Sequence, residues 1–298
     1  MKRNPTTLLL VSLLGIAVLI AFGYQIGTLL FVQPQTIFDG QRAYLDVLKQ
    51  HDLGPRVPGS QAHTAIEDMV REQLQPYGWI VEVNPIEYRG HTVRNIIARR
   101  GQGNTWILLG AHYDSRQRAD AKVNWQQAKN PVPGANDGAS GVAVLLELGR
   151  TLPRELDKEI WLVFLDLEDQ GNLPGWDWII GSSALADSLP NQPSAVIIVD
   201  MIGDANLNIH KEINSNAELT SSIWQTAHKL GYEQQFLPNY KYRMLDDHLP
   251  FIQKGIPAID IIDFDYPYWH TEEDTPDKVS AQSLEAVGRT LWTWLTEN

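Results

Sequence analysis

Four continuous apolar runs constrain the fold of this chain more than any other feature. They are Trp106–Gly110, Ile160–Leu165, Ala195–Val199 and Ala258–Ile262. Short runs of this kind are typical of strands buried on both faces, which occur in parallel sheets covered by helices. Apolar residues also recur at helical spacing, notably over Gly141–Leu152 and Ala281–Leu295. The pattern predicts an α/β domain whose central sheet is mixed, mostly parallel and flanked by helices.

The N-terminal half of that domain contributes further elements. Pro34–Arg56 is interpreted as a short connector and an entry helix, and Gln61–Gln75 carries apolar residues at helical spacing. Trp79–Val83 and Val93–Ala98 are rich in β-branched residues, as strands are. The polar stretch Arg116–Pro133 is expected to form a surface loop beside the site.

The N-terminal segment differs from the rest of the chain. An apolar run from Leu8 to Phe22 continues, interrupted by Gln25, to Val32. A bilayer core requires about 20 mostly apolar residues, so residues 7–32 are predicted to form one transmembrane signal-anchor helix. A cleaved signal peptide, which would make the protein secreted, is the alternative, but no convincing small-x-small cleavage pattern follows the run. A buried helix of a soluble fold fits less well, because no polar residues mark a solvent face.

The flanking charges predict the orientation and the domain boundaries. Lys2 and Arg3 place residues 1–6 in the cytoplasm by the charge-bias rule, so the remainder would lie outside. Residues 33–43 would then connect the anchor to one catalytic domain over residues 44–298. We expect that domain to be monomeric.

Charge and cysteine content narrow the possible chemistry. The formal net charge is −12 at pH 7, and no basic stripe offsets it, so nucleic-acid binding is not expected. The chain has no cysteine, which excludes disulfides and thiolate metal sites. Any metal must therefore be held by His, Asp or Glu.

Polar residues follow each of the four apolar runs. In chain order they are His112, Asp114, Asp166, Glu168, Asp169, Asp200 and, at the end of a loop, His270. Sites in open α/β sheets assemble at the carboxyl ends of the strands, so these side chains are expected to converge.

Asp137 joins this set from the turn Gly134–Gly138, just before a predicted helix. An isolated Asp there would be interpreted as a helix N-cap. Beside several acids and imidazoles it fits better as a metal ligand, because an acidic cluster repels itself without a cation. Imidazole and carboxylate donors are typical of zinc or a similar divalent ion.

The motif set resembles the zinc aminopeptidase family M28 from about Tyr44 to the C-terminus. The motifs are His112-x-Asp114, Gly134-x-Asn136-Asp137-Gly138, Glu168-Asp169, Asp200 and His270-Thr271-x-x-Asp274-Thr275. The resemblance implies a mixed sheet flanked by helices and a cis peptide between Asp137 and Gly138.

The same resemblance implies roles for the site residues. Asp137 would bridge two zinc ions, with Asp169 and His270 completing one site and His112 and Asp200 the other. Glu168 would be the general base. Asp169 stands where many members of the family have Glu.

A narrower resemblance is to the glutaminyl-peptide cyclotransferase branch of this superfamily. Four features carry it: the Asp-Asp-His-x-Pro-Phe segment over Asp246–Phe251, Trp269 directly before His270, the segment Gly54–Ser60, and the run Glu168-Asp169-x-Gly171, which resembles bacterial cyclases in particular. This branch keeps the aminopeptidase ligands but works with one zinc. The segment Asn136–Gly141 is closer to the aminopeptidase motif, and the long insertion Arg116–Pro133 has no assigned role.

The cyclotransferase resemblance implies conversion of an N-terminal Gln of peptides or proteins to pyroglutamate, with release of ammonia. One zinc on Asp137, Asp169 and His270 would polarise the γ-carbonyl. Glu168 would move a proton from the α-amine to the leaving ammonia. The remaining expected participants are Asp200 and Asp246 as a hydrogen-bonded acid network, and Trp269 with Trp176 or Trp178 as walls that exclude water.

Two other interpretations stay open at this level. An M28-type aminopeptidase would use two zinc ions, with His112 and Asp200 completing the second site. A non-catalytic ectodomain on the same fold is the third, because a fold does not guarantee chemistry. Peptide N-termini are the expected substrate for both enzymes.

Overall fold

We describe residues 37–103, 105–122 and 127–297 in a computed structural model of the chain. They belong to one compact unit, Ile37–Asn298. The predicted anchor, residues 7–32, and the start of the connector lie outside the described residues. Within the described ranges, no helix has both the length and the apolar character needed to cross a membrane.

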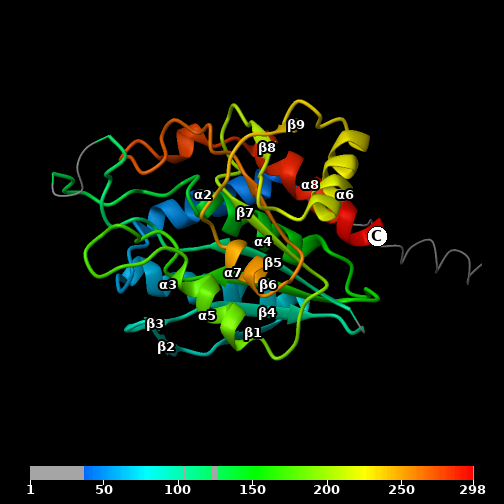
Figure 1. Ribbon diagram of the computed structural model, residues 1–298, viewed down its shortest axis with the longest axis horizontal. Helices are drawn as coiled ribbons and strands as arrows, with labels where there is room; N and C mark the ends of the chain where they lie inside the picture. Colours follow the sequence, from blue (N-terminus) through cyan, green and yellow to red (C-terminus); the bar gives the residue numbers. More distant parts are fainter. Residues whose placement is uncertain (1–36, 104, 123–126, 298) are drawn as a thin grey trace, which may run out of the picture. The chain divides into compact units, whose positions relative to one another are not determined.

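A six-stranded sheet forms the centre of this unit (Figure 1). Its strands, in spatial order, are β1 (Ile80–Val83), β4 (Ile96–Arg100), β6 (Glu159–Leu165), β5 (Trp106–His112), β7 (Ala195–Asp200) and β10 (Ala258–Ile262). Strands β6, β5, β7 and β10 are parallel, whereas β4 runs antiparallel to both β6 and β1. The predicted mixed, mostly parallel sheet is therefore confirmed.

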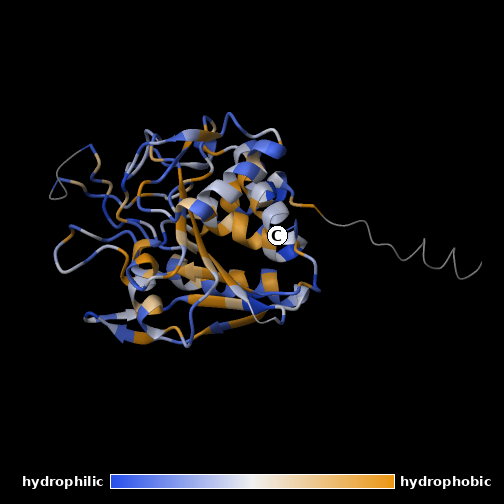
Figure 2. Ribbon diagram, turned by 45° about the vertical axis from the view of Figure 1, so that its right-hand side comes forward, coloured by the Kyte–Doolittle hydropathy of each residue, from blue (hydrophilic) through white to orange (hydrophobic). Residues whose placement is uncertain are grey.

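Each central strand buries both faces, which explains the continuous apolar runs. In β5, for example, Ile107 and Leu109 belong to one hydrophobic cluster and Trp106 and Leu108 to another. The first cluster lies under α2 (Gly40–Leu53), α3 (Gln61–Leu74), α4 (Ala139–Thr151), α6 (Ala217–Lys229) and α8 (Ala281–Glu297). The second lies under α5 (Ile180–Ser188) and α7 (Leu249–Gln253). Figure 2 shows the apolar residues concentrated on the sheet and on the inner sides of the helices.

The smaller elements complete the unit. They are β2 (Ile86–Tyr88), β3 (His91–Val93), β8 (Ile209–Lys211), β9 (Phe236–Tyr240) and the 3-10 turns η1 (Gln75–Tyr77) and η2 (Pro276–Lys278). The sequence interpretation did not include these or helices α5, α6 and α7. Helix α6 carries a detectable signal, because Leu219, Ile223 and Ala227 recur at helical spacing and are buried.

Helix α2 begins inside the predicted connector. Gly40 starts it, and a Cβ at Gly40 would lie 2.1 Å from the carbonyl oxygen of Ala281 in α8. This close approach requires glycine and joins the first turn of α2 to the core, so the compact unit begins before Tyr44.

Candidate metal centre and active site

The carboxyl ends of β5, β6, β7 and β10 bring the predicted polar residues together. Asp137, Asp169 and His270 offer donor atoms within 4.8 Å of one another. The Nε2 atom of His270 lies 2.7 Å from Oδ1 of Asp169 and 3.7 Å from Oδ2 of Asp137. All three side chains are buried. The predicted first ligand set is therefore a real cluster.

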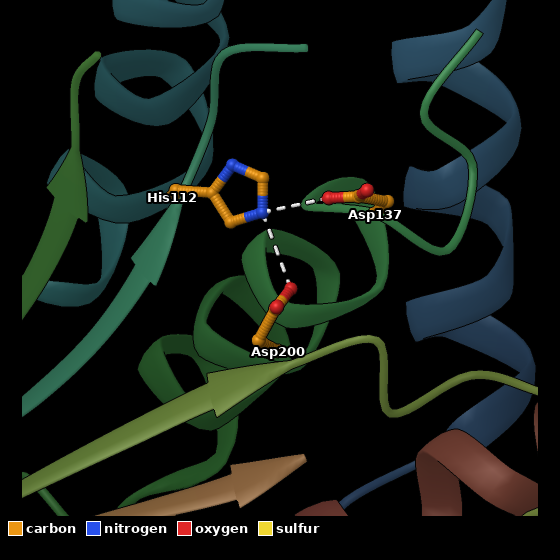
Figure 3. A group of neighbouring side chains, drawn as sticks. All are labelled: His112, Asp137 and Asp200. Atoms are coloured by element: carbon orange, nitrogen blue, oxygen red, sulfur yellow. Dashed lines mark hydrogen bonds and ion pairs between the residues drawn. The ribbon is translucent and has the colours of Figure 1, made fainter. Parts of the chain in front are cut away.

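A second cluster shares Asp137. The Nε2 atom of His112 lies 3.1 Å from Oδ1 of Asp137 and 3.2 Å from Oδ1 of Asp200. Figure 3 shows this single ring nitrogen facing both carboxylates. Asp137 thus turns one oxygen towards each imidazole, as the predicted bridging ligand would.

The backbone is left-handed at three positions where it presents these groups. Leu167, Met201 and His270 have φ of 55°, 48° and 53°. Non-glycine residues rarely adopt this region, and such strain persists where the surrounding structure enforces it. Leu167 precedes Glu168, and Met201 follows Asp200, so these turns set the direction of the functional side chains.

One expectation is wrong. The described residues contain no cis peptide bond, so the bond between Asp137 and Gly138 is trans. The chain turns into α4 instead through Gly138, which has a φ of 72°. A Cβ at Gly138 would lie 2.4 Å from the carbonyl oxygen of His112, so this position requires glycine for space as well.

Two buried groups hold the turn that carries Asp137. The guanidinium of Arg56 donates to the carbonyl oxygens of Tyr113 at 3.0 Å and Gly134 at 2.6 Å. The carboxylate of Asp274 accepts from the backbone N–H groups of Asn136 at 2.9 Å and Asp137 at 3.1 Å. Arg56 and Asp274 both lie in motifs described from the sequence, but only the structure shows that they hold this turn.

Asp114 holds the loop after β6, which carries Glu168 and Asp169. Its carboxylate accepts from the backbone N–H of Glu168 at 3.0 Å and of Asp169 at 3.3 Å. It also lies 3.6 Å from Nδ1 of His112. Asp114 therefore holds His112 of β5 and the loop after β6 in a fixed position relative to each other.

A cavity of about 180 Å³ opens onto these groups. Its polar lining comprises Asp137, Glu168, Asp169, Asp200, Asp246 and His270, and its apolar lining comprises Trp178, Met201, Met244, Leu245, Ile262, Phe264 and Trp269. A larger hollow of about 630 Å³ is lined by residues that include Arg99, Arg100 and Glu159, and its lining contains no histidine.

Two of the three predicted tryptophans line the cavity, and the third does not. Trp269 and Trp178 line the cavity and stack on the His270 ring, with centroid separations of 3.8 Å and 5.9 Å. Trp176 does not line it, because its ring stacks on His91 of β3 at 4.1 Å and packs in a separate apolar cluster. Gly171 makes room for Trp178, since a Cβ there would lie 2.0 Å from the indole.

Burial changes the protonation of the acids around the cavity. It raises the pKa of Asp200 to about 7, with the charge of Asp246 adding to the effect against the opposing bonds from His112. Burial likewise raises the pKa of Asp169 to about 6 and that of Glu168 well above its usual range. Like charges crowded away from water favour a bound cation, which would stabilise the ionised forms.

The donor set fits the zinc that the fold family implies. Zinc ligands lie about 2.0–2.2 Å from the ion, so two donors on one ion are at most about 4.4 Å apart. The separations of 2.7 Å and 3.7 Å in the first cluster satisfy this limit. Oδ2 of Asp137 and Oδ2 of Asp169 are also buried without a hydrogen-bond partner.

A deeper polar cluster was not anticipated. His248 lies 3.3 Å from Glu212 and 3.8 Å from Asp260, and all three side chains are buried. With Asp246, His248 and Asp260 form a third group of donors within 4.8 Å. Asp246 and His248 belong to the Asp-Asp-His segment described above. Nothing in the sequence linked them to Asp260, which lies in β10.

Comparison with known proteins is consistent with this arrangement. The model of peptidase family M28 matches residues 95–295, so the chain belongs to that family. The chain is 28% identical to glutaminyl-peptide cyclotransferase of Boiga irregularis, over 83% of this chain and 80% of the relative.

Solved structures give the same picture. The glutaminyl cyclase of Porphyromonas gingivalis is 33% identical, with a TM-score of 0.80 over 88% of this chain and 99% of that one. A Zn-dependent exopeptidase from Parabacteroides distasonis is 29% identical, with a TM-score of 0.81 over 89% of this chain and 100% of that one. The similarity supports an activity of the glutaminyl cyclase or M28 exopeptidase class.

Proposed function

We propose that this protein is a zinc-dependent glutaminyl-peptide cyclotransferase, which converts an N-terminal Gln to pyroglutamate and releases ammonia. The observation that carries the proposal is the position of Asp246, an acid beyond the shared ligand set, in the same cavity as Asp200 and Glu168. The names of the similar cyclases support the same choice.

Asp137, Asp169 and His270 would hold one zinc ion. When bound there, zinc supplies Lewis-acid polarisation of the substrate γ-carbonyl. The α-amine forms a bond to Cδ, the carbonyl carbon of the glutamine side-chain amide, while the bond from Cδ to the amide nitrogen breaks. Glu168 accepts the proton from the amine and donates it to the departing ammonia.

The remaining lining residues make the amine, rather than water, the nucleophile. Trp269 and Trp178 present flat apolar surfaces to the glutamine stem. At about 180 Å³ the cavity is smaller than the roughly 300–1,000 Å³ pockets of drug-sized ligands, so it suits one side chain. Asp200 and Asp246 would share a proton and steady the amine-derived positive charge.

A two-zinc aminopeptidase is the second candidate. The complete cluster of His112, Asp137 and Asp200 favours it, since these residues could hold a second ion. Asp246 argues against it, because an additional buried acid beside Asp200 competes for the same proton or cation.

Two peptides separate the candidates. One peptide begins with Gln and the other with Leu, and each is incubated with the zinc-loaded protein. We expect ammonia and a pyroglutamyl product from the first and no cleavage of the second. Leucine release together with two tightly bound zinc ions per chain would overturn the proposal.

Asp246→Asn tests the role of Asp246, and Asp277→Asn, at an exposed position outside the cavity lining, is its control. The first substitution should lower ammonia release, and the second should not. Unchanged ammonia release by Asp246→Asn would remove the observation on which the cyclotransferase proposal rests.

We also propose that residues 7–32 anchor the protein in a membrane, with the catalytic unit outside the cytoplasm. The support is the length and apolar character of that segment and the basic residues Lys2 and Arg3 before it.

A further inference from the structure

We propose that Asp120 is a positioning residue for the metal ligand His270, and that the start of the insertion, residues 116–121, forms the outer shell of the metal site. The inference rests on the proposed zinc site. It gives a role to a segment that neither the M28 ligand set nor the cyclotransferase motifs explain.

Two contacts join this segment to His270. Oδ1 of Asp120 lies 3.7 Å from Nδ1 of His270, the ring nitrogen that faces away from Asp137 and Asp169. The backbone N–H of Ala121 donates to the carbonyl oxygen of His270 at 3.2 Å. The segment therefore contacts both the ring and the backbone of a residue 150 positions later, whose φ is left-handed.

Arg116 holds Asp120 in place. Its guanidinium donates to both carboxylate oxygens of Asp120, at 2.7 Å and 2.8 Å. The same guanidinium donates to the carbonyl oxygens of Asp169 at 2.9 Å and Gly171 at 3.0 Å. Its charge also lies 4.9 Å from the centre of the Trp178 ring.

This arrangement links the two ligands through the buried guanidinium of Arg116 and the half-buried carboxylate of Asp120. Arg116 is 2% exposed, so its bonds to the Asp169 loop form away from solvent, whereas those to the half-buried Asp120 are partly shielded. A bidentate bond between Arg and carboxylate fixes orientation as well as position. Asp120 is thereby held with one oxygen towards the His270 ring.

The chemistry of metal-bound histidine gives this contact its function. A ligating imidazole usually donates its second ring N–H to a carboxylate or carbonyl, which sets the tautomer and strengthens the ligand. Asp120 is the acid in that position for His270, as Asp114 is for His112. The loss of such an outer partner typically costs about 10–100-fold in metal affinity.

The test compares the zinc affinity of the full-length wild-type chain with that of Asp120→Asn by competition with a chelator. Asn keeps the size of the side chain and one acceptor for Arg116 but lacks the negative charge. We expect zinc to bind about 10–100-fold more weakly. We also expect excess zinc to restore ammonia release and the absorption spectrum of the Co²⁺-loaded protein to shift.

Lys122→Gln is the control within the same segment. Lys122 pairs with Glu273 at 4.0 Å, and both side chains are exposed. Its substitution should leave zinc affinity and the Co²⁺ spectrum unchanged.

Urea unfolding of the metal-free proteins distinguishes an effect of Asp120 on the position of His270 from an effect on the stability of the fold. Equal unfolding free energies for wild type and Asp120→Asn, with weaker zinc binding in the variant, support the inference. Equal zinc affinity, or a loss of metal-free stability that accounts for the weaker binding, overturns it. If the wild-type chain itself binds no zinc, the proposed function fails as well, whereas a failure confined to Asp120→Asn leaves that function standing.

Discussion

Asp137 directs one carboxylate oxygen towards His112 and the other towards His270, so both donor clusters depend on a single side chain. The neighbouring acids differ in their surroundings. Asp169 contacts His270, whereas Glu168 lines the cavity. Adjacent residues in the chain therefore support different roles, one in metal binding and one in proton transfer.

Glu168→Gln should separate those roles. We expect the variant to keep its zinc and its fold but to lose about 10²–10⁴-fold in kcat, because the amide cannot accept the proton. The measurements are zinc content and ammonia release at saturating substrate. Asp169→Asn is the matched variant and should lose zinc instead. Near-normal turnover by Glu168→Gln would show that another group is the base.

At the scale of elements, the site depends on how closely α4 approaches the sheet. The turn before α4 carries Asp137, and the helix packs over β5 and β7. Gly141 permits the approach, because a Cβ there would lie 2.5 Å from the carbonyl oxygen of Val199 and 2.8 Å from Cβ of Ala111. Backbone and a short side chain cannot move aside, so the contact is rigid.

Gly141→Ala should therefore be destabilising. At a solvent-exposed helix position, the change from Gly to Ala would stabilise the helix by about 1 kcal/mol. Overpacking costs about 1–3 kcal/mol, so we expect the free energy of unfolding to fall and zinc affinity to decrease as the Asp137 turn shifts. Urea unfolding measures the free energy of unfolding, and competition with a chelator measures the zinc affinity.

Gln225→Ala on the exposed side of α6 is the control for that experiment. An exposed helix position away from special features should change stability by no more than about 0.5 kcal/mol. A gain in stability for Gly141→Ala would show that the space above the sheet is open.

At the scale of the whole molecule, the compact unit from Ile37 onward contains both hydrophobic clusters of the sheet and every site residue described above. A chain that begins at Gln33 should consequently be soluble, keep its zinc and retain normal ammonia release. The full-length protein should partition into the membrane fraction. Uncleaved full-length protein in the soluble fraction would contradict the anchor, and an inactive shortened chain would show that the first residues contribute to the site.

The sequence determined the sheet and the main ligands for one physical reason. Strands buried on both faces must be continuously apolar, so the first charged residues after each run mark the strand end where sites form. His112, Glu168, Asp169 and Asp200 were found in this way. His270 and Asp137 lie in a loop and a turn, so they were added to this set by their position after the fourth run and before a predicted helix. The resemblance to M28 then supplied their specific ligand roles.

The tertiary structure alone decided which of the remaining side chains reach the metal site. Trp176 and Trp178 are two residues apart, yet only Trp178 lines the cavity, because Gly171 makes room for its ring. Asp120 looked like part of a polar surface loop, but it faces a ring 150 positions later. Contacts between loops that are distant in the chain leave no local pattern of hydropathy, so only the folded backbone brings them into view.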